Sequence, residues 1–245
     1  MSVENRIDWS GLEQRTQPVS KDIRERIKKA GDRYWAGDNI SKHIHHGEKD
    51  LLIDELANKF EGVLDSLLID RYNDPNSKGT AKRLAKMYIN EIMAGRYEPA
   101  PAATAFPNDG ENRYEGMLVV RSELTSMCSH HHQIVRGVAY IGIIASEKLI
   151  GLSKYTRIAQ WCAMRGTLQE ELANDIVREI QKATDAEHLG VYIQATHGCV
   201  ENRGVRAHSS LTQTTVLKGA FKDDPGTKKE FMDNIKLQQQ YACDK

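Results

Sequence analysis

The residue types that can bind a metal gather in two short stretches of the sequence. Cys128 and His131 stand in a Cys-x-x-His relation, which lets both side chains reach one ion from a turn. His197 and Cys199 are two positions apart at the end of a segment with strand character, so their side chains point to the same side. The thiolates and imidazole of Cys128, His131 and Cys199 form a donor set that suits zinc, and three protein ligands leave a fourth position for a catalytic water.

The same residues also have a simpler interpretation. The cysteines can be buried thiols, and His130, His131 and His132 can form a solvated loop. One Cys-x-x-His pair does not decide between the two. A second cluster, at residues 43–46, has no cysteine and no obvious acidic partner nearby, and we interpret it as a surface loop.

A candidate anion site opens one of the predicted helices. Ser153 and Lys154 lie at its start, and Arg157 follows one turn later. A helix N-terminus with a hydroxyl and two cations is a natural phosphate site. The alternative is structural, with Ser153 as the N-cap and both cations solvated.

A candidate base-reading pair opens the next predicted helix. Gln169 and Glu170 lie in its first turn, and a carboxylate beside an amide could read the edge of a guanine. Thr167 and Glu170 also have the spacing of a capping box, which is a purely structural role.

The elements that must position these residues are helices and strands in mixed order. Apolar spacing and stop signals predict helices over residues 20–37, 51–68, 80–95, 153–164 and 167–180. Runs rich in β-branched residues predict strands over residues 117–120, 133–144, 191–199 and 211–217. Residues 97–111 are expected to be a loop, residues 147–151 a turn, and residues 224–235 a last helix. This order is typical of an α+β fold with an antiparallel sheet.

Composition excludes several classes of function. The chain has 245 residues, long enough for its own core, and 34 basic residues balance 34 acidic ones. Balanced charge argues against a general nucleic-acid binder. The sequence has no run of about 18 apolar residues, so no transmembrane helix is expected. No secretory signal is expected in residues 1–15.

Cysteine usage favours a reducing compartment. The chain has four cysteines, which lie far apart, at Cys128, Cys162, Cys199 and Cys243. A secreted disulfide framework would be denser, so we expect a cytoplasmic protein.

The segments occur in an order that resembles one known family. They are residues 126–131, 150–157, 168–170, 195–199, 203–205, 209–215 and 219–221. Together they resemble GTP cyclohydrolase I, and residues 80–88 are similar to that family's helix before the catalytic domain. The similarity runs from about Asp74 to the C-terminus.

The resemblance implies a fold and an assembly. The fold is the tunnelling fold, an α+β fold in which antiparallel sheets with packed helices, from several subunits, close into a barrel. An N-terminal helical arm at residues 1–75 would precede a catalytic domain at residues 76–245. The family is a homodecamer of two face-to-face pentamers, with active sites between subunits.

The resemblance also implies a reaction. It is the zinc-dependent hydrolytic opening of the guanine imidazole ring of GTP at C8, with release of formate and rearrangement to 7,8-dihydroneopterin triphosphate. Folate, biopterin and 7-deazaguanine synthesis all start from this step. Two alternatives are a GTP-binding zinc scaffold without turnover, and a related tunnelling-fold purine or pterin enzyme that stops at an earlier product.

Carried over by position, the resemblance gives each candidate residue a role. The implied zinc ligands are Cys128, His131 and Cys199. The implied proton-transfer residues beside the metal are His130 and His197. The implied guanine-binding residues are Gln169 and Glu170. The implied triphosphate-binding residues are Arg83, Ser153, Lys154, Arg157 and Arg203.

The sequence departs from the family pattern beside these residues. Ser129 stands where the family often has Glu, and Glu171 stands where it often has Arg. The stretch at residues 132–135 is more polar than usual. Every implied ligand and phosphate-binding cation is nevertheless present, so the reaction class is unaffected.

Overall fold

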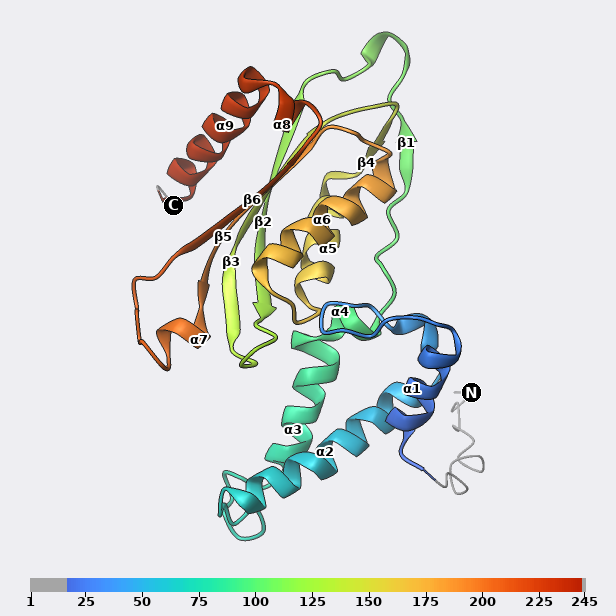
Figure 1. Cartoon of the computed structure of the whole chain (residues 1–245), viewed down its shortest axis with the longest axis vertical. Coiled ribbons are helices and arrows are strands. Elements are labelled where there is room, and N and C mark those ends of the chain that lie inside the picture. Colours follow the sequence, from blue (N-terminus) through green and yellow to red (C-terminus); the bar gives the residue numbers. More distant parts are fainter. Residues whose placement is uncertain (1–16, 244–245) are drawn as a thin grey trace, which may run out of the picture. The chain divides into compact units, whose positions relative to one another are not determined.

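The computed structural model describes residues 17–243, which form two compact units (Figure 1). The first unit holds residues 17–33 and 42–89, and the second holds residues 34–41 and 90–243. The predicted division between residues 75 and 76 stays a prediction. Residues 1–15, where no secretory signal is expected, lie outside the described range.

The first unit is helical. Its main helices are α1 (Val19–Lys29), α2 (Glu48–Ser66) and α3 (Thr80–Met87), and α2 contacts both of the others. The predicted extension of the first helix to Gly37 is wrong. Gly31 has φ +71°, in the left-handed region, and this ends the helix.

The histidine cluster at residues 43–46 begins in a 3₁₀ turn (Ser41–His43) and continues as a loop in which His45 and His46 are exposed. His43 Nε2 lies 2.8 Å from a carboxylate oxygen of Asp32, and only 10% of the His43 side chain is exposed. His43 therefore has an acidic partner, Asp32, which lies three residues after the end of α1.

The helix predicted over residues 80–95 consists of three pieces. After α3 come a π-helical turn (Tyr88–Ile92) and the short helix α4 (Ala94–Tyr97). A Cβ atom on Gly95 would lie 2.0 Å from the carbonyl oxygen of Trp161. Only glycine therefore allows α4 to approach the backbone of α5 (Leu152–Ala163) this closely.

The second unit is built on a four-stranded antiparallel sheet. Its strands, in spatial order, are β2 (Met117–Met127), β3 (Ile134–Ile144), β5 (Leu189–His197) and β6 (Thr212–Lys218). A separate ribbon pairs β1 (Ala105–Pro107) with β4 (Lys148–Ile150). The predicted class of helices with an antiparallel sheet is confirmed. No helix within residues 17–243 has the length and apolar character to cross a membrane.

Strand β2 is longer than predicted. It continues past Val120 to Met127, with Ser122 and Ser126 buried and Glu123 exposed. The inward-facing positions of β2 hold serine as well as leucine, so apolar and polar residues do not alternate regularly along the strand. β1 and β4 fall in the predicted loop and turn because three residues are too short to show a period.

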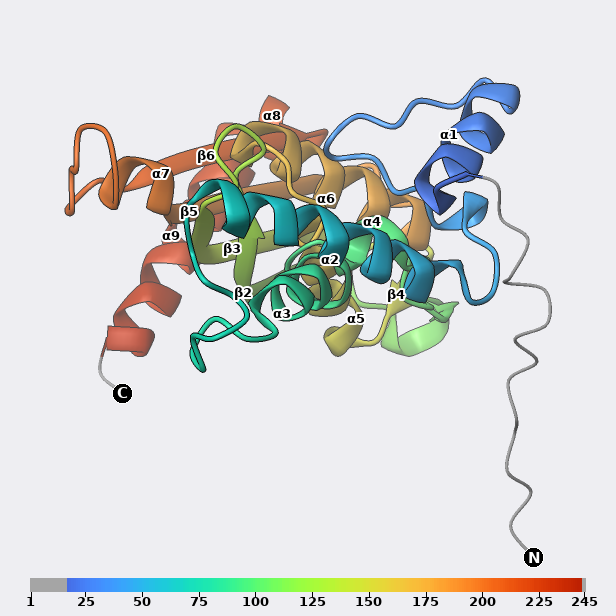
Figure 2. The ribbon, with the colours of Figure 1, turned by 90° about the horizontal axis from the view of Figure 1, so that it is seen from below.

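Helices cover both faces of the sheet. α5 and α6 (Gln169–Thr184) lie on one face, and α9 (Pro225–Cys243) lies on the other, after the short α8 (Ala220–Asp223) (Figures 1 and 2). Alternate residues of each strand face the two layers. Ile141 and Ile193, for example, are buried in the core beneath α5 and α6.

Two paired glycines let C-terminal aromatic rings reach the other face. Gly142 and Gly190 are opposite each other in the β3–β5 register. A Cβ atom on Gly142 would lie 2.7 Å from ring atoms of both Phe221 and Phe231. The two rings meet edge to face with centroids 5.2 Å apart. α8 and α9 thus close a second core directly over the glycines.

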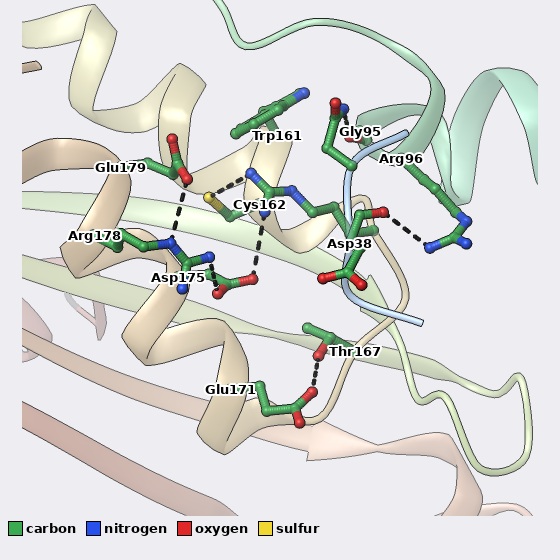
Figure 3. A network of polar contacts seen from close by, with 12 residues as sticks. Asp38, Gly95, Arg96, Trp161, Cys162, Thr167, Glu171, Asp175, Arg178 and Glu179 are labelled. Carbon is green, nitrogen blue, oxygen red and sulfur yellow. Dashed lines mark hydrogen bonds and ion pairs between the residues drawn. The ribbon is translucent and has the colours of Figure 1, made fainter. Parts of the chain in front are cut away.

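The segment at residues 34–41 is fixed to α4 by one guanidinium group. Arg96 Nη1 donates to the carbonyl oxygens of Ala36 and Asp38, each at 2.9 Å, and Nη2 donates to that of Tyr34 at 3.0 Å. Figure 3 shows this contact beside the α5–α6 loop. A Cβ atom on Gly37 would lie 2.9 Å from the hydroxyl of Thr167, so this segment packs on the loop.

A buried cation anchors the start of the α5–α6 loop (Figure 3). The Arg165 side chain is 3% exposed, and its guanidinium carbon lies 3.7 Å from the centre of the Trp161 ring. Arg165 Nη1 lies 3.4 Å from Asp175 Oδ2, and Arg165 Nη2 lies 3.6 Å from Cys162 Sγ. These contacts join Asp175 on α6 to the C-terminal end of α5, just before the loop reaches Gln169.

Asp175 has a second partner of a different kind. Arg178 Nη2 donates to Asp175 Oδ1 at 2.5 Å, but the Arg178 side chain is 51% exposed. Burial raises the pKa of Asp175, against the lowering effect of the two guanidinium groups. The carboxylate therefore depends on both cations, of which only Arg165 is itself buried.

We predict that Arg165→Gln and Arg178→Gln differ sharply in their effect on stability. Loss of the buried cation should lower the free energy of unfolding by about 3 kcal/mol, because it removes one partner of a buried ion pair. Loss of the exposed cation should cost less than about 1 kcal/mol. Urea unfolding at one fixed protomer concentration measures both. Equal losses in the two variants would contradict the assigned role of Arg165.

Candidate metal and substrate site

The turn between β2 and β3 presents two of the candidate ligands. The backbone N–H of Cys128 donates to the carbonyl of Gln133 at 2.9 Å, and the N–H of His132 donates to the carbonyl of Cys128 at 2.9 Å. His132 has φ +51°, so the chain turns back sharply there. This closes a short loop that carries Cys128 and His131.

The end of β5 brings the third ligand to the same place. His197, the last residue of β5, pairs in register with Val135 at the start of β3. The short helix α7 (Gly198–Glu201) follows at once and carries Cys199. A Cβ atom on Gly198 would lie 3.0 Å from the carbonyl of Ile134, so the two segments are in close contact. Figure 2 looks onto this end of the sheet.

The ligand atoms of Cys128, His131 and Cys199 lie within 4.8 Å of one another. Cys128 is buried, Cys199 is partly buried and His131 is exposed. Two sulfurs and one ring nitrogen that converge at this distance could hold a metal ion. The structure therefore brings together the three residues that the sequence pattern suggested.

The cysteines differ in their environment. Cys128, Cys162 and Cys199 are free. Burial, reinforced by the neighbouring Cys128 thiol, raises the pKa of Cys199. Burial also raises the pKa of Cys162 to about 12, because this thiol lies in the core beneath α5 and α6. Cys162 is therefore an inert core residue.

The two candidate proton-transfer residues flank the ligand group. His130 is exposed, and its ring is perpendicular to that of His131 with centroids 6.3 Å apart. His197 is partly buried, and its Nε2 lies at hydrogen-bond distance, 2.7 Å, from Oε1 of Gln169. Burial lowers the pKa of His197, while the carboxylates of Glu170 and Glu201 act in the opposite direction.

Gln169 begins α6 and is buried, with 4% of its surface exposed. Its Oε1 lies 2.7 Å from His197 Nε2. Its Nε2 lies 3.4 Å from the carbonyl of Ile193 and 3.2 Å from both the carbonyl of Thr212 and the hydroxyl of Thr214. The amide is thus occupied at both ends by β5 and β6.

Glu170 and Glu171 have different surroundings. The predicted capping box between Thr167 and Glu170 is wrong. Leu168 is the N-cap residue of α6 and makes no side-chain cap bond. The Thr167 hydroxyl donates instead to Glu171 Oε2 at 2.6 Å. The Glu170 carboxylate is exposed and accepts no hydrogen bond among the described residues, so it is available to a ligand.

The triphosphate candidates do not all lie at the metal end. Gly151, and not Ser153, is the N-cap residue of α5, so the structural alternative for Ser153 is wrong. Ser153 and Arg157 are exposed near the start of this helix. Arg203 lies in an exposed loop after α7, and its charge lowers the pKa of Cys199.

The direction of α5 separates the two groups within one chain. Ser126 at the metal end of β2 donates its hydroxyl hydrogen to the carbonyl of Ala163, the last residue of α5, at 2.7 Å. The helix rise then places Ser153 about 15 Å from that end. Lys154, the next residue, lies at the same end of α5. Arg83 belongs to the first unit, where its guanidinium donates to the carbonyls of Asn76 and Lys78.

Sequence reasoning missed the residues that hold the site in place. Arg165 and Asp175 are ten positions apart across a loop, a spacing with no motif. Thr212 and Thr214 fell in a predicted strand, and their alternation was the one signal that they share a face. Their contact with Gln169 depends on tertiary structure.

Comparison with known proteins gives a consistent result. The family model of GTP cyclohydrolase I matches residues 57–236. The chain is 40% identical over 190 residues to GTP cyclohydrolase 1 of Flavobacterium johnsoniae, covering 77% of this chain and 84% of that protein. It is 36% identical over 185 residues to GTP cyclohydrolase 1 of Aeromonas salmonicida, covering 75% and 84%.

One solved structure aligns more weakly. The archaeosine synthase QueF-Like in the apo form has a TM-score of 0.35 and 13% identity, over 42% of this chain and 93% of that chain. This similarity is too low to bear on fold or function. The family match spans well over half of the chain, and the relatives exceed one third identity. The chain belongs to the GTP cyclohydrolase I family.

Proposed function

We propose that this chain is a zinc-dependent enzyme that opens the imidazole ring of GTP at C8, releases formate and forms 7,8-dihydroneopterin triphosphate. The observation that carries the proposal is the convergence of Cys128, His131 and Cys199 beside His197, in a chain that belongs to this family. Free thiols at the proposed ligands fit a reducing cytoplasm, where we place the protein.

The donor chemistry favours zinc as the metal. Thiolate and imidazole ligands suit this ion, and three protein ligands match a catalytic site. When bound, zinc would supply a water of lowered pKa as the nucleophile. Cys128, in the buried wall, and Cys199, at the start of α7, would hold the ion from two different strand ends.

The histidines would move protons on the substrate. His197 follows the same strand end as Cys199 and is held by Gln169 through one ring nitrogen, so its other ring nitrogen is suited to take up a proton and pass it to N7 of the guanine as the ring opens. His130 is exposed on the adjacent turn and would exchange protons with solvent or with the ribose.

Glu170 would recognise the guanine. Its carboxylate can accept from the ring N1–H and from the exocyclic amine at once, and its charge strengthens both bonds. The carboxylate is exposed and accepts no hydrogen bond among residues 17–243. Its charge also acts on His197, so the guanine edge and the proton-transfer residue would be close together.

The triphosphate would bind to cations and to a helix N-terminus. The proposed set is Arg83, Ser153, Lys154, Arg157 and Arg203. The phosphates would not be cleaved. Their binding energy would position the base against the metal end of the sheet.

A homo-oligomer would complete the site. Within one chain, α5 carries Ser153 and Lys154 about 15 Å from the metal end, so a second copy is suited to supply them. β2 and β6 each pair along one side only among the described residues, which leaves edges for sheet closure into a barrel. We propose the family's decamer, with residues 1–75 as its helical arm. Sedimentation of the active species tests this, and a fully active monomer would refute it.

The decisive test of the reaction is anaerobic incubation with GTP, with and without a chelator. We expect formate and a product with the mass of 7,8-dihydroneopterin triphosphate, both lost with the chelator. A zinc scaffold would bind GTP and release no formate. An enzyme that stops early would accumulate a formamidopyrimidine.

We predict about one zinc ion per chain, bound by Cys128, His131 and Cys199. Cys199→Ala should lose both the metal and activity, because two remaining ligands hold zinc poorly. Cys162→Ala is the matched control and should keep its zinc, since this buried thiol is not one of the converging ligands. Metal analysis of the purified variants measures both. Stoichiometric zinc in Cys199→Ala would overturn the assignment.

Adjacent carboxylates provide a matched test of guanine recognition. Glu170→Gln should keep the fold and the zinc but lower GTP turnover by on the order of a hundredfold, because a charge-assisted bond is lost and the base is misplaced. Glu171→Gln should retain most turnover, since the new amide oxygen can still accept from Thr167. Turnover with GTP and melting temperature check both variants. If Glu170→Gln turns over GTP normally, this role is wrong.

A further inference from the structure

The orientation of the Gln169 amide is fixed by what lies around it. Its Nε2 group faces the carbonyl oxygens of Ile193 and Thr212, at 3.4 and 3.2 Å. Carbonyl oxygens only accept hydrogen bonds, so the nitrogen must be on that side. The carbonyl end, Oε1, is therefore the atom that faces His197, at 2.7 Å.

This orientation determines where the neutral His197 ring carries its hydrogen. Oε1 of Gln169 can only accept, so Nε2 of His197 must donate. In a neutral imidazole the other nitrogen, Nδ1, then carries the free lone pair. The alternative tautomer would set two lone pairs against each other at 2.7 Å.

The anchor for this bond is the sheet itself. Ile193 lies opposite Thr214 in the β5–β6 register, and Thr212 lies opposite Ala195, so both acceptors of Gln169 belong to one fixed strand pair. Gln169 is 4% exposed, and the cavity beside it has a volume of only about 10 Å³, which leaves no room for a base. Water and substrate therefore compete little for the amide.

We propose that Gln169 is a positioning residue for His197, which it holds with hydrogen on Nε2 and with Nδ1 as the free acceptor. This differs from the guanine-binding role that the family resemblance implied for Gln169. Recognition of the base then falls to Glu170, whose carboxylate is exposed. The effect on catalysis rests on the proposed function, which gives the identity of the reaction. The tautomer of His197 rests only on the contacts of Gln169.

The first test is spectroscopic and needs no turnover. Solid-state ¹⁵N spectra of the zinc-loaded protein with labelled histidine report which ring nitrogen carries hydrogen, and His197→Asn identifies the signal. We expect His197 to be protonated on Nε2 in the wild type. In Gln169→Leu the Nδ1-protonated form should appear, while Gln169→Glu, which retains an acceptor, should keep the wild-type tautomer. An Nδ1-protonated ring in the wild type would overturn the proposal.

The second test separates positioning from base recognition. Gln169→Leu should lower kcat with GTP by about a hundredfold or more, the usual share of proton transfer, and change KM by less than about threefold. Gln169→Glu should lose less kcat than Gln169→Leu. Binding of GTP to the chelated protein, measured by calorimetry, should be nearly unchanged in Gln169→Leu and weakened at least tenfold in Glu170→Gln.

The outcomes distinguish the two levels of the proposal. Tenfold weaker GTP binding in Gln169→Leu, with an unchanged His197 signal, would make Gln169 a base reader and refute the positioning role. Wild-type protein that releases no formate from GTP would refute the proposed function, while the tautomer measurement would still stand. If Gln169→Leu does not fold, the Gln169→Glu variant decides in its place, through the ¹⁵N signal of its His197 and through its change in kcat compared with its change in KM.

Discussion

The pairing of β3 with both of its neighbours is the constraint on which the site depends. One side of β3 joins β2 through the turn that carries Cys128 and His131, and the other side aligns Val135 with His197, two residues before Cys199. Because side chains alternate along a strand, a slip of one residue in the β3–β5 register would turn His197 to the opposite face. The buried alternation of Ile141 and Ile193 resists such a slip, so apolar packing in the middle of the sheet fixes the chemistry at its end.

A second layer of control lies in the α5–α6 loop. Arg165 is buried against Trp161 and Asp175 just before this loop, and Gln169 bonds to the sheet just after it. Between them, Thr167 is held by Glu171. The exposed Glu170 therefore projects from a segment that is fixed on both sides, which is what a rigid recognition group requires.

Much of this could be predicted from the sequence, and the limits have physical causes. The ligand set was visible because Cys128 and His131 are near each other in the chain and Cys199 closely follows His197. The strand predicted to reach Cys199 was too long, since β5 ends at His197 and Cys199 lies in α7. Of the helices in the second unit, α6 followed from apolar spacing, whereas α7 and α8 were missed because four residues are too few to show a helical period. The length of β2 did not, since Ser122 and Ser126 are polar residues in buried positions. The partner of Thr167 was misassigned because Glu170 and Glu171 both satisfy the spacing within one residue.

The ligand group also has a consequence for how the chain folds. Cys128 and His131 meet as soon as a local hairpin forms, but Cys199 lies about seventy residues further along the sequence. The second sulfur, which is the third ligand atom, reaches the others only after α5, α6 and the long-range β3–β5 pairing are in place. Contacts between residues this far apart in the sequence form slowly, because the chain loses loop-closure entropy before the contacts can stabilise it. Tight binding of the proposed metal ion would therefore be a late event in folding, and an ion held by all three residues would mark a sheet whose strands are already paired in order.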